Sequence, residues 1–249
     1  DAFSNFDGIS YAKGASVLKQ MMFYIGEENF RDGIRTYLKK FYEKNTVLDD
    51  FLSCMSDASG VDINSWSKQW LETTGVNTLK PNLNTNNCTV QQIPSATNNQ
   101  LRDHAVLYEN YALQNGKPEI VDDGKVFIKG KTSEFSLNKS GDFLLLNAKD
   151  HDFVKVFFEE RDLEFITNHV SSIEDRFTRR IIWGNLWQMV RDNALSPNRY
   201  LGMIEKHLSL EKDITVSQGQ LSAKAMATMS VFLTEENKAS WKEKFFNLS

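Results

Sequence analysis

The stretch Phe6-Asp7-Gly8-Ile9-Ser10-Tyr11-Ala12-Lys13-Gly14-Ala15-Ser16-Val17-Leu18 predicts the start of the first helix of this chain. Apolar side chains recur in and beyond it every three or four residues, which places them on one face of a helix. The predicted apolar face consists of Tyr11, Ala15, Leu18, Met22 and Ile25. Gly26 interrupts the pattern, so we expect the helix to end near residue 25.

The helical pattern continues to about residue 79. A second apolar face consists of Phe30, Ile34, Tyr37, Leu38 and Phe41. We expect Thr46 to cap a third helix, because Asp49 follows three residues later in the capping-box position. Asp62 is expected to cap a fourth helix, in which Trp66 and Trp70 belong to the core rather than to a binding site.

The pattern changes between residues 80 and 158, where short runs rich in Val, Ile, Phe and Tyr alternate with turn residues. Three dipeptides predict turns: Asn115-Gly116, Asp123-Gly124 and Ser140-Gly141. Short strands at this spacing favour a small antiparallel β-sandwich.

Residues 159 to 249 return to helical spacing. Ser196 and Pro197 predict a helix start, with Ser as the N-cap and Pro at the first helical position. Two further helices are expected over about 214 to 231 and 235 to 247. The predicted fold class is therefore multidomain α+β, with a helical unit over 1–79, a β-sandwich over 80–158 and the start of a solenoid-like helical domain over 159–249.

Composition excludes several classes of protein. The 249 residues carry a net charge of -4, so no strong positive field attracts nucleic acid, and no apolar run is long enough to span a membrane. Cys54 and Cys88 are expected to be free thiols, which favours a reducing, cytoplasmic location. The first residues lack both an initiator Met and a signal peptide, so we expect the sequence to be cut from a longer protein.

The sequence contains no self-sufficient catalytic or metal-binding motif. The four histidines are too far apart to share a helical turn, and none is followed by Glu, as a helical zinc-hydrolase motif requires; they are His104, His151, His169 and His207. Asp150-His151-Asp152 is expected to be a solvated turn rather than a cation site. Cys54 lies on an apolar helix face, which favours a core thiol over a nucleophile.

Two motifs nevertheless resemble a known family. Phe6–Leu18 is similar to the Tyr-x-Lys-Gly segment of M1 zinc aminopeptidases, which lies downstream of their zinc motif. Trp66-Ser67-Lys68-Gln69-Trp70-Leu71-Glu72-Thr73-Thr74-Gly75-Val76-Asn77 resembles the W-x-x-Q-W-x-x-x-x-G-x-P motif of the same family, with Asn77 in place of Pro. Weaker similarity to the actinobacterial aminopeptidase N branch continues through 101–104, 144–147 and 183–192.

This resemblance implies a function. Residues 1–79 would be the helical C-terminal part of a thermolysin-like catalytic domain, and Tyr11 would donate to the tetrahedral oxyanion formed when zinc-bound water attacks a peptide carbonyl. A phenol suits this role because it stays protonated at neutral pH. The zinc ligands and the N-terminal half of the enzyme would lie outside this chain. We therefore expect peptide substrates for the whole enzyme, and inactivity and self-association for the chain alone.

Two alternatives remain open from the sequence. The chain could be a non-catalytic helical and β scaffold or interaction module, for which Tyr11 would have no chemical purpose. It could also be an α-solenoid adaptor with an inserted β-segment. The second alternative requires helices to stack continuously across residue 80, whereas the peptidase interpretation requires helical, β and helical units in that order.

Overall fold

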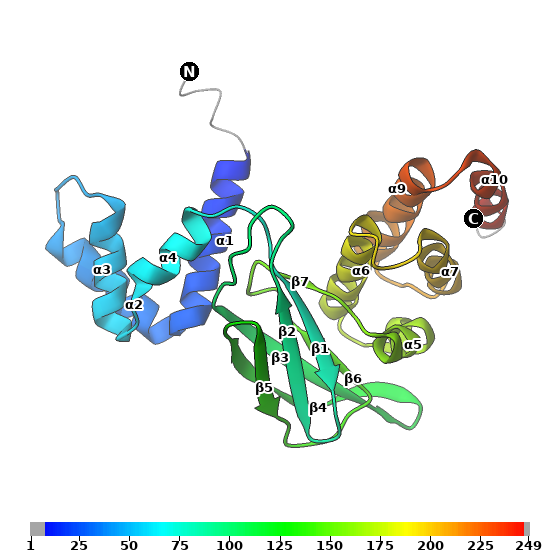
Figure 1. Ribbon diagram of the computed structural model, residues 1–249, viewed down its shortest axis with the longest axis horizontal. Helices are drawn as coiled ribbons and strands as arrows, with labels where there is room; N and C mark the ends of the chain where they lie inside the picture. Colours follow the sequence, from blue (N-terminus) through cyan, green and yellow to red (C-terminus); the bar gives the residue numbers. More distant parts are fainter. Residues whose placement is uncertain (1–7, 247–249) are drawn as a thin grey trace.

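The computed structural model describes residues 8–246, so Phe6, Asp7 and Asn247 of the segments discussed above lie outside it. Four helices are followed by seven strands and then by a second group of helices (Figure 1). Helices, sheets and helices thus occur in the order that the sequence predicts, and they do not stack continuously across residue 80. The mixed α+β fold class is confirmed, while the division at residues 79 and 158 stays a prediction.

The first helical unit contains α1 Gly8–Ile25, α2 Glu27–Lys40, α3 Leu48–Ser59 and α4 Ile63–Leu71. Gly26 separates α1 from α2 with a φ of 90°, a conformation that residues with a Cβ rarely adopt. Asp62 caps α4 as expected, because its carboxylate accepts from the backbone N–H of Ser65 at 3.0 Å. Cys54, Trp66 and Trp70 are buried in this unit, as predicted.

The predicted cap of α3 is wrong by one residue. The N-cap is Val47, whose backbone N–H donates to the carboxylate of Asp50 at 3.0 Å. Thr46 does not cap the helix, because its hydroxyl is engaged at 2.6 Å with the hydroxyl of Tyr37 on α2. The side chain of Thr46, which the sequence pattern assigned to the cap of α3, is therefore used in a contact with α2.

Two sheets form the β-sandwich. The strands are β1 Thr78–Leu83, β2 Asn87–Ile93, β3 His104–Gln114, β4 Lys117–Ile128, β5 Thr132–Ser136, β6 Phe143–Leu146 and β7 Lys155–Val156. One sheet has the order β5-β2-β1-β7 and the other β4-β3-β6, and all neighbours are antiparallel except β1 and β7. The four residues of β6 are all buried and belong to the larger hydrophobic core.

The turn predictions in this region have different outcomes. Asn115 and Gly116 both have positive φ and join β3 to β4 as a two-residue hairpin, as predicted. Asp123-Gly124 is not a turn: Gly124 lies inside β4, opposite Tyr108 on β3. A Cβ on Gly124 would lie 3.0 Å from the Tyr108 ring, so the glycine leaves room for a cross-strand aromatic side chain.

Asn77 shows how the helical unit is joined to the sheets. Its side-chain oxygen accepts from the guanidinium of Arg102 at 2.6 Å, and its amide donates to the carbonyl of Gln100 at 2.7 Å. Arg102 also donates to the carbonyl of Gln69 on α4 at 2.8 Å. The residue that departs from the family motif therefore has a structural partner of its own.

The second group of helices contains α5 Glu160–His169, η2 Val170–Ser172, α6 Arg176–Arg191, α7 Pro197–Leu208, α8 Ile214–Val216, the π-helix η3 Ser217–Ser222, α9 Ala223–Phe232 and α10 Glu235–Phe246. The helix start at Ser196 and Pro197 is confirmed. The helix expected over 214–231 is present, with a π-helical segment in its middle. These helices share one hydrophobic core with both sheets, whereas α1, α3 and α4 form a second core that includes Ala105 of β3.

Candidate functional site

Tyr11 lies near the N-terminal end of α1, which extends away from the sheets (Figure 1). Its side chain is 66% exposed, and Ala15 and Leu18 of the predicted apolar face are exposed as well. The helix becomes buried only from Gln20 and Met21 onward. The apolar pattern thus identified the helix correctly, but Tyr11, Ala15 and Leu18 of the predicted apolar face remain exposed in the described part of the chain.

The buried half of α1 is attached to β3 through Asp152. One carboxylate oxygen accepts from Gln20 Nε2 at 2.8 Å and lies 3.2 Å from His104 Nδ1. The other oxygen accepts from the backbone N–H of Ala105 at 3.0 Å. Asp152 is 5% exposed and Gln20 is 3% exposed, so these hydrogen bonds form away from water.

The expectation that Asp150-His151-Asp152 is a solvated turn is therefore wrong for two of its three residues. Asp150 is exposed, but Asp152 is buried and His151 stacks on Phe23 of α1 with 4.1 Å between ring centroids. Burial, with a contribution from the charge of Lys19, lowers the pKa of His151. The physical reason is that α1 packs on this segment, and Gln20 precedes Asp152 by 132 residues.

The two lysines beside this contact bind backbone carbonyls. Lys19 of α1 donates to the carbonyl of Asp150 at 2.8 Å. Lys125 of β4 donates to the carbonyls of Phe23 and Tyr24, the latter at 3.1 Å. Cationic groups at the C-terminal end of a helix satisfy its last carbonyls and oppose its dipole. Lys125 therefore binds the C-terminal end of α1, and Lys19 links α1 to the backbone of Asp150.

Three of the histidines belong to different elements of the structure. His104 begins β3, His169 ends α5 and His207 lies in α7. Across residues 8–246, no three His, Cys, Asp or Glu side chains gather in a way that could hold a metal ion. Cys54 and Cys88 are both free and buried, and burial raises the pKa of Cys88 to about 12, so its thiol is inert at neutral pH.

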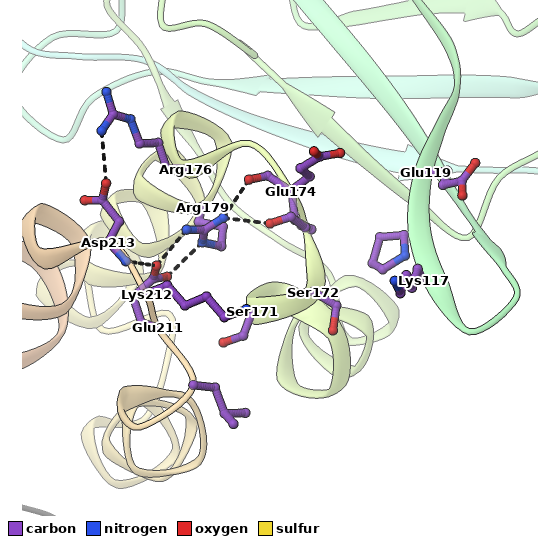
Figure 2. Close-up of a pocket in the computed structure, with 13 residues that line it drawn as sticks. Lys117, Glu119, Ser171, Ser172, Glu174, Arg176, Arg179, Glu211, Lys212 and Asp213 are labelled. Carbon is purple, nitrogen blue, oxygen red and sulfur yellow. Dashed lines mark hydrogen bonds and ion pairs between the residues drawn. The ribbon is translucent and has the colours of Figure 1, made fainter.

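A cavity of about 710 Å³ lies between the β3–β4 hairpin and the second group of helices (Figure 2). Arg179 forms a bidentate pair with Glu211 at 2.8 and 2.6 Å and donates to backbone carbonyls of residues 173–174. Arg176 pairs with Asp213 at 3.1 Å. Both arginines are thus neutralised by neighbouring carboxylates. The ion pairs link α6 to residues 211–213, and this favours a structural role over anion binding.

Ser171 at the edge of this cavity contacts His207. The hydroxyl oxygen lies 2.7 Å from His207 Nδ1, and His207 Nε2 lies 2.9 Å from the carbonyl of Thr167. Burial is the main cause of the lowered pKa of His207. A neutral ring that donates from Nε2 to Thr167 and accepts at Nδ1 from Ser171 satisfies both contacts and ties α7 to α5 and η2.

Sequence reasoning missed Gln20 and assigned Asp152 to the wrong environment. One feature of the sequence could have pointed to Gln20: this polar residue comes directly before Met21 and Met22 on a helix predicted to be amphipathic. A buried glutamine at such a position needs a partner. Which residue supplies it could not be read from the chain.

Comparison with known proteins agrees with this architecture. A model of the peptidase family M1 domain matches residues 1–70, and a model of the ERAP1-like C-terminal domain matches residues 143–248. The chain is 35% identical to aminopeptidase N of Streptomyces lividans over 234 residues, which is 88% of this chain and 27% of that protein. It is 25% identical to glutamyl aminopeptidase of Sus scrofa over 98% of this chain and 26% of that protein.

A solved structure shares the fold. The crystal structure of Legionella pneumophila aminopeptidase A in complex with aspartic acid matches with a TM-score of 0.64 and 18% identity. The match covers 98% of this chain and 30% of that one. At this identity the likeness concerns the fold alone.

The fold and these matches define a chain related to aminopeptidases. Its similarity is to peptidase family M1, whose domain model matches residues 1–70, and to aminopeptidase N over most of the chain. It spans about a quarter of the length of the curated relatives it matches.

Proposed function

We propose that this chain is the C-terminal part of an M1 metallo-aminopeptidase that removes N-terminal residues from peptides, and that Tyr11 stabilises the tetrahedral oxyanion. The observation that carries the proposal is the position of Tyr11: it lies in the segment that matches the M1 domain, on the exposed half of α1. An exposed phenol on a helix can reach a substrate held by another part of the enzyme.

The chemistry follows from the phenol. When a nucleophile adds to a peptide carbonyl, the oxygen gains negative charge, and a donor placed 2.7–3.1 Å from it stabilises the transition state more than the ground state. Tyr11 can donate its O–H without giving up the proton. Zinc in such an enzyme would have to be held by residues outside 8–246, because the described side chains offer no suitable set of ligands.

The exposed apolar side chains of α1 support a partner that covers them. Tyr11 and Leu18 are 66% and 44% exposed. In the proposed enzyme the N-terminal half packs on this face, so the chain alone would expose it and tend to self-associate. Peptide substrates would bind where the two halves meet.

The test is Tyr11→Phe in an enzyme that contains this chain joined to an N-terminal M1 half. We expect kcat for an aminoacyl chromogenic substrate to fall by roughly 10²–10³-fold with little change in KM, because the hydroxyl acts in the transition state. Tyr42→Phe is the matched control, since Tyr42 is 73% exposed in the same helical unit. A Tyr11→Phe enzyme with unchanged kcat would exclude the oxyanion role.

One observation favours the scaffold alternative. Leu38, Tyr42, Val47 and Leu48 are exposed apolar residues where α2 meets α3, away from Tyr11. A surface of this kind suits a protein contact. The same Tyr11→Phe experiment separates the two functions, because a scaffold loses nothing with that hydroxyl.

A further inference from the structure

Helix α1 carries Tyr11 at a distance from its attachment. Tyr11 precedes Gln20 by nine residues, which is about 13 Å along a helix at 1.5 Å per residue. The residues between them are mostly exposed. Rotation of α1 about Gln20 by about 5° would move Tyr11 by about 1 Å, and a misplacement of that size can cost on the order of 10²-fold in rate. The direction of α1 therefore matters as much as its presence.

Apolar packing alone does not fix that direction. Met21, Tyr24 and Ile25 bury α1 in the smaller core, but apolar contacts are non-directional and allow small rotations. Hydrogen bonds restrict both distance and angle. The side chain of Gln20 is the first buried one on the chain path from Tyr11, and its amide donates to Asp152.

Asp152 is suited to hold α1 because it is a carboxylate with fixed neighbours. It faces three nitrogens, on Gln20, His104 and Ala105, and a carboxylate can accept from all of them whereas an amide cannot. The backbone of Asp152 is fixed by Asn147, whose side chain accepts from its N–H at 3.0 Å and donates to its C=O at 2.8 Å.

The loop that presents Asp152 is itself conformationally restrained. Asn147, Lys149 and Asp150 all have φ between 53° and 66°, a region that residues with a Cβ avoid. Three such residues within four positions persist only where the surroundings hold them. Lys19 donates to the carbonyl of Asp150, so α1 also contacts this restrained backbone.

We infer that Asp152, acting through Gln20, sets the direction of α1 and so positions Tyr11 for the reaction proposed above. Asp152 and Gln20 are positioning residues: neither touches substrate, and each acts through the helix that carries the phenol. The inference rests on the proposed function of Tyr11, and its experiments distinguish the failure of one from the failure of the other.

The attachment is tested on this chain by amide hydrogen exchange. Gln20→Met keeps the length and helix propensity of the side chain but removes the donor to Asp152. We expect exchange of the amides of residues 19–25 to accelerate by roughly five-fold, as the loss of one buried hydrogen bond implies. Gln218→Met is the matched control, since Gln218 is an exposed glutamine in η3. Unchanged exchange in residues 19–25 would overturn the inference, and unchanged exchange in β3 shows that the variant is folded.

The positioning role is tested by combining substitutions in the joined enzyme. We expect Gln20→Met to lower kcat by roughly 10-fold or more with KM unchanged, and to have no further effect when Tyr11 is already Phe. A general loss of structure would lower kcat by the same factor in both backgrounds, and that result overturns the inference while leaving the role of Tyr11 intact. If Tyr11→Phe itself has no effect, the proposed function fails first.

Discussion

Asp162 illustrates how a single buried carboxylate behaves in this fold. It lies in the first turn of α5, is 5% exposed and accepts from the backbone N–H of Glu159 at 3.0 Å. Burial raises the pKa of Asp162 to about 6, although the hydrogen bond from Glu159 and the charge of Arg161 oppose the shift. The helix start thus contains a carboxylate whose charged form is destabilised by burial.

We predict that Asp162→Asn stabilises the chain at pH 8 and not at pH 4. In the unfolded chain this carboxyl has an ordinary pKa near 4, so its contribution to stability is present below about pH 4 and is lost as pH rises through 6. A neutral amide avoids that loss, which for a shift of about two pKa units increases the free energy of unfolding at pH 8 by up to about 3 kcal/mol. Urea unfolding at both pH values measures the difference.

Asp32→Asn is the control for this prediction. Asp32 is exposed on α2 and forms an ion pair with Arg35, three residues away, at 3.0 Å. We expect its substitution to change stability by less than about 0.5 kcal/mol at either pH. A loss of stability in Asp162→Asn at pH 8 would show that the hydrogen bond outweighs the burial of charge.

At the scale of elements, the crossing of α2 and α3 depends on a glycine. Gly33 is buried in the interior of α2, and a Cβ there would lie 2.7 Å from Met55 Sδ and 3.2 Å from the carbonyl of Cys54. The methionine end can move, but the backbone carbonyl cannot without shifting α3. The two helices therefore approach each other at a distance that only glycine permits.

We predict that Gly33→Ala destabilises the chain by about 1–3 kcal/mol through overpacking, although alanine gains about 1 kcal/mol in helix propensity. Gly184→Ala in α6 is the matched control, because a Cβ at Gly184 meets nothing within 4 Å. That control should gain up to about 1 kcal/mol. Thermal unfolding measures whether each variant is more or less stable than the unmodified chain. A stabilised Gly33→Ala variant would show that α3 can shift to make room for the added Cβ.

At the scale of the whole molecule, the chain has two hydrophobic cores that are built from different elements. The larger core unites both sheets with the second group of helices, and the smaller core holds α1, α3 and α4 against Ala105 of β3. Residues 11–16 of α1 are in neither core and are exposed. This asymmetry is what the proposed enzyme requires, since the phenol must lie where another part of the protein meets it.

We predict that the chain alone binds no stoichiometric zinc and does not hydrolyse an aminoacyl chromogenic substrate. The described side chains offer no metal site, and oxyanion stabilisation without a nucleophile gives no turnover. Metal analysis of the pure chain and an activity assay with and without chelator measure both points. Chelator-sensitive hydrolysis by the pure chain would contradict the prediction and place a metal site within it.

Local sequence determined several element boundaries directly. Gly26 ends α1, Asp62 caps α4, and Asn115 with Gly116 forms the hairpin between β3 and β4. Each follows from backbone preferences of the residue itself or of its close neighbours, so no distant contact was needed. The helix that carries Tyr11 was predictable from the three- and four-residue spacing of its apolar side chains.

Tertiary structure decided what the sequence could not. Thr46 binds Tyr37 instead of capping α3, Gly124 accommodates Tyr108 within a strand, and Asp152 is buried under Gln20. An amphipathic pattern shows which face of a segment is apolar, but not what covers it. That depends on residues brought together from distant positions by packing, which is why the sequence identified the helix of Tyr11 while only the fold revealed what holds it.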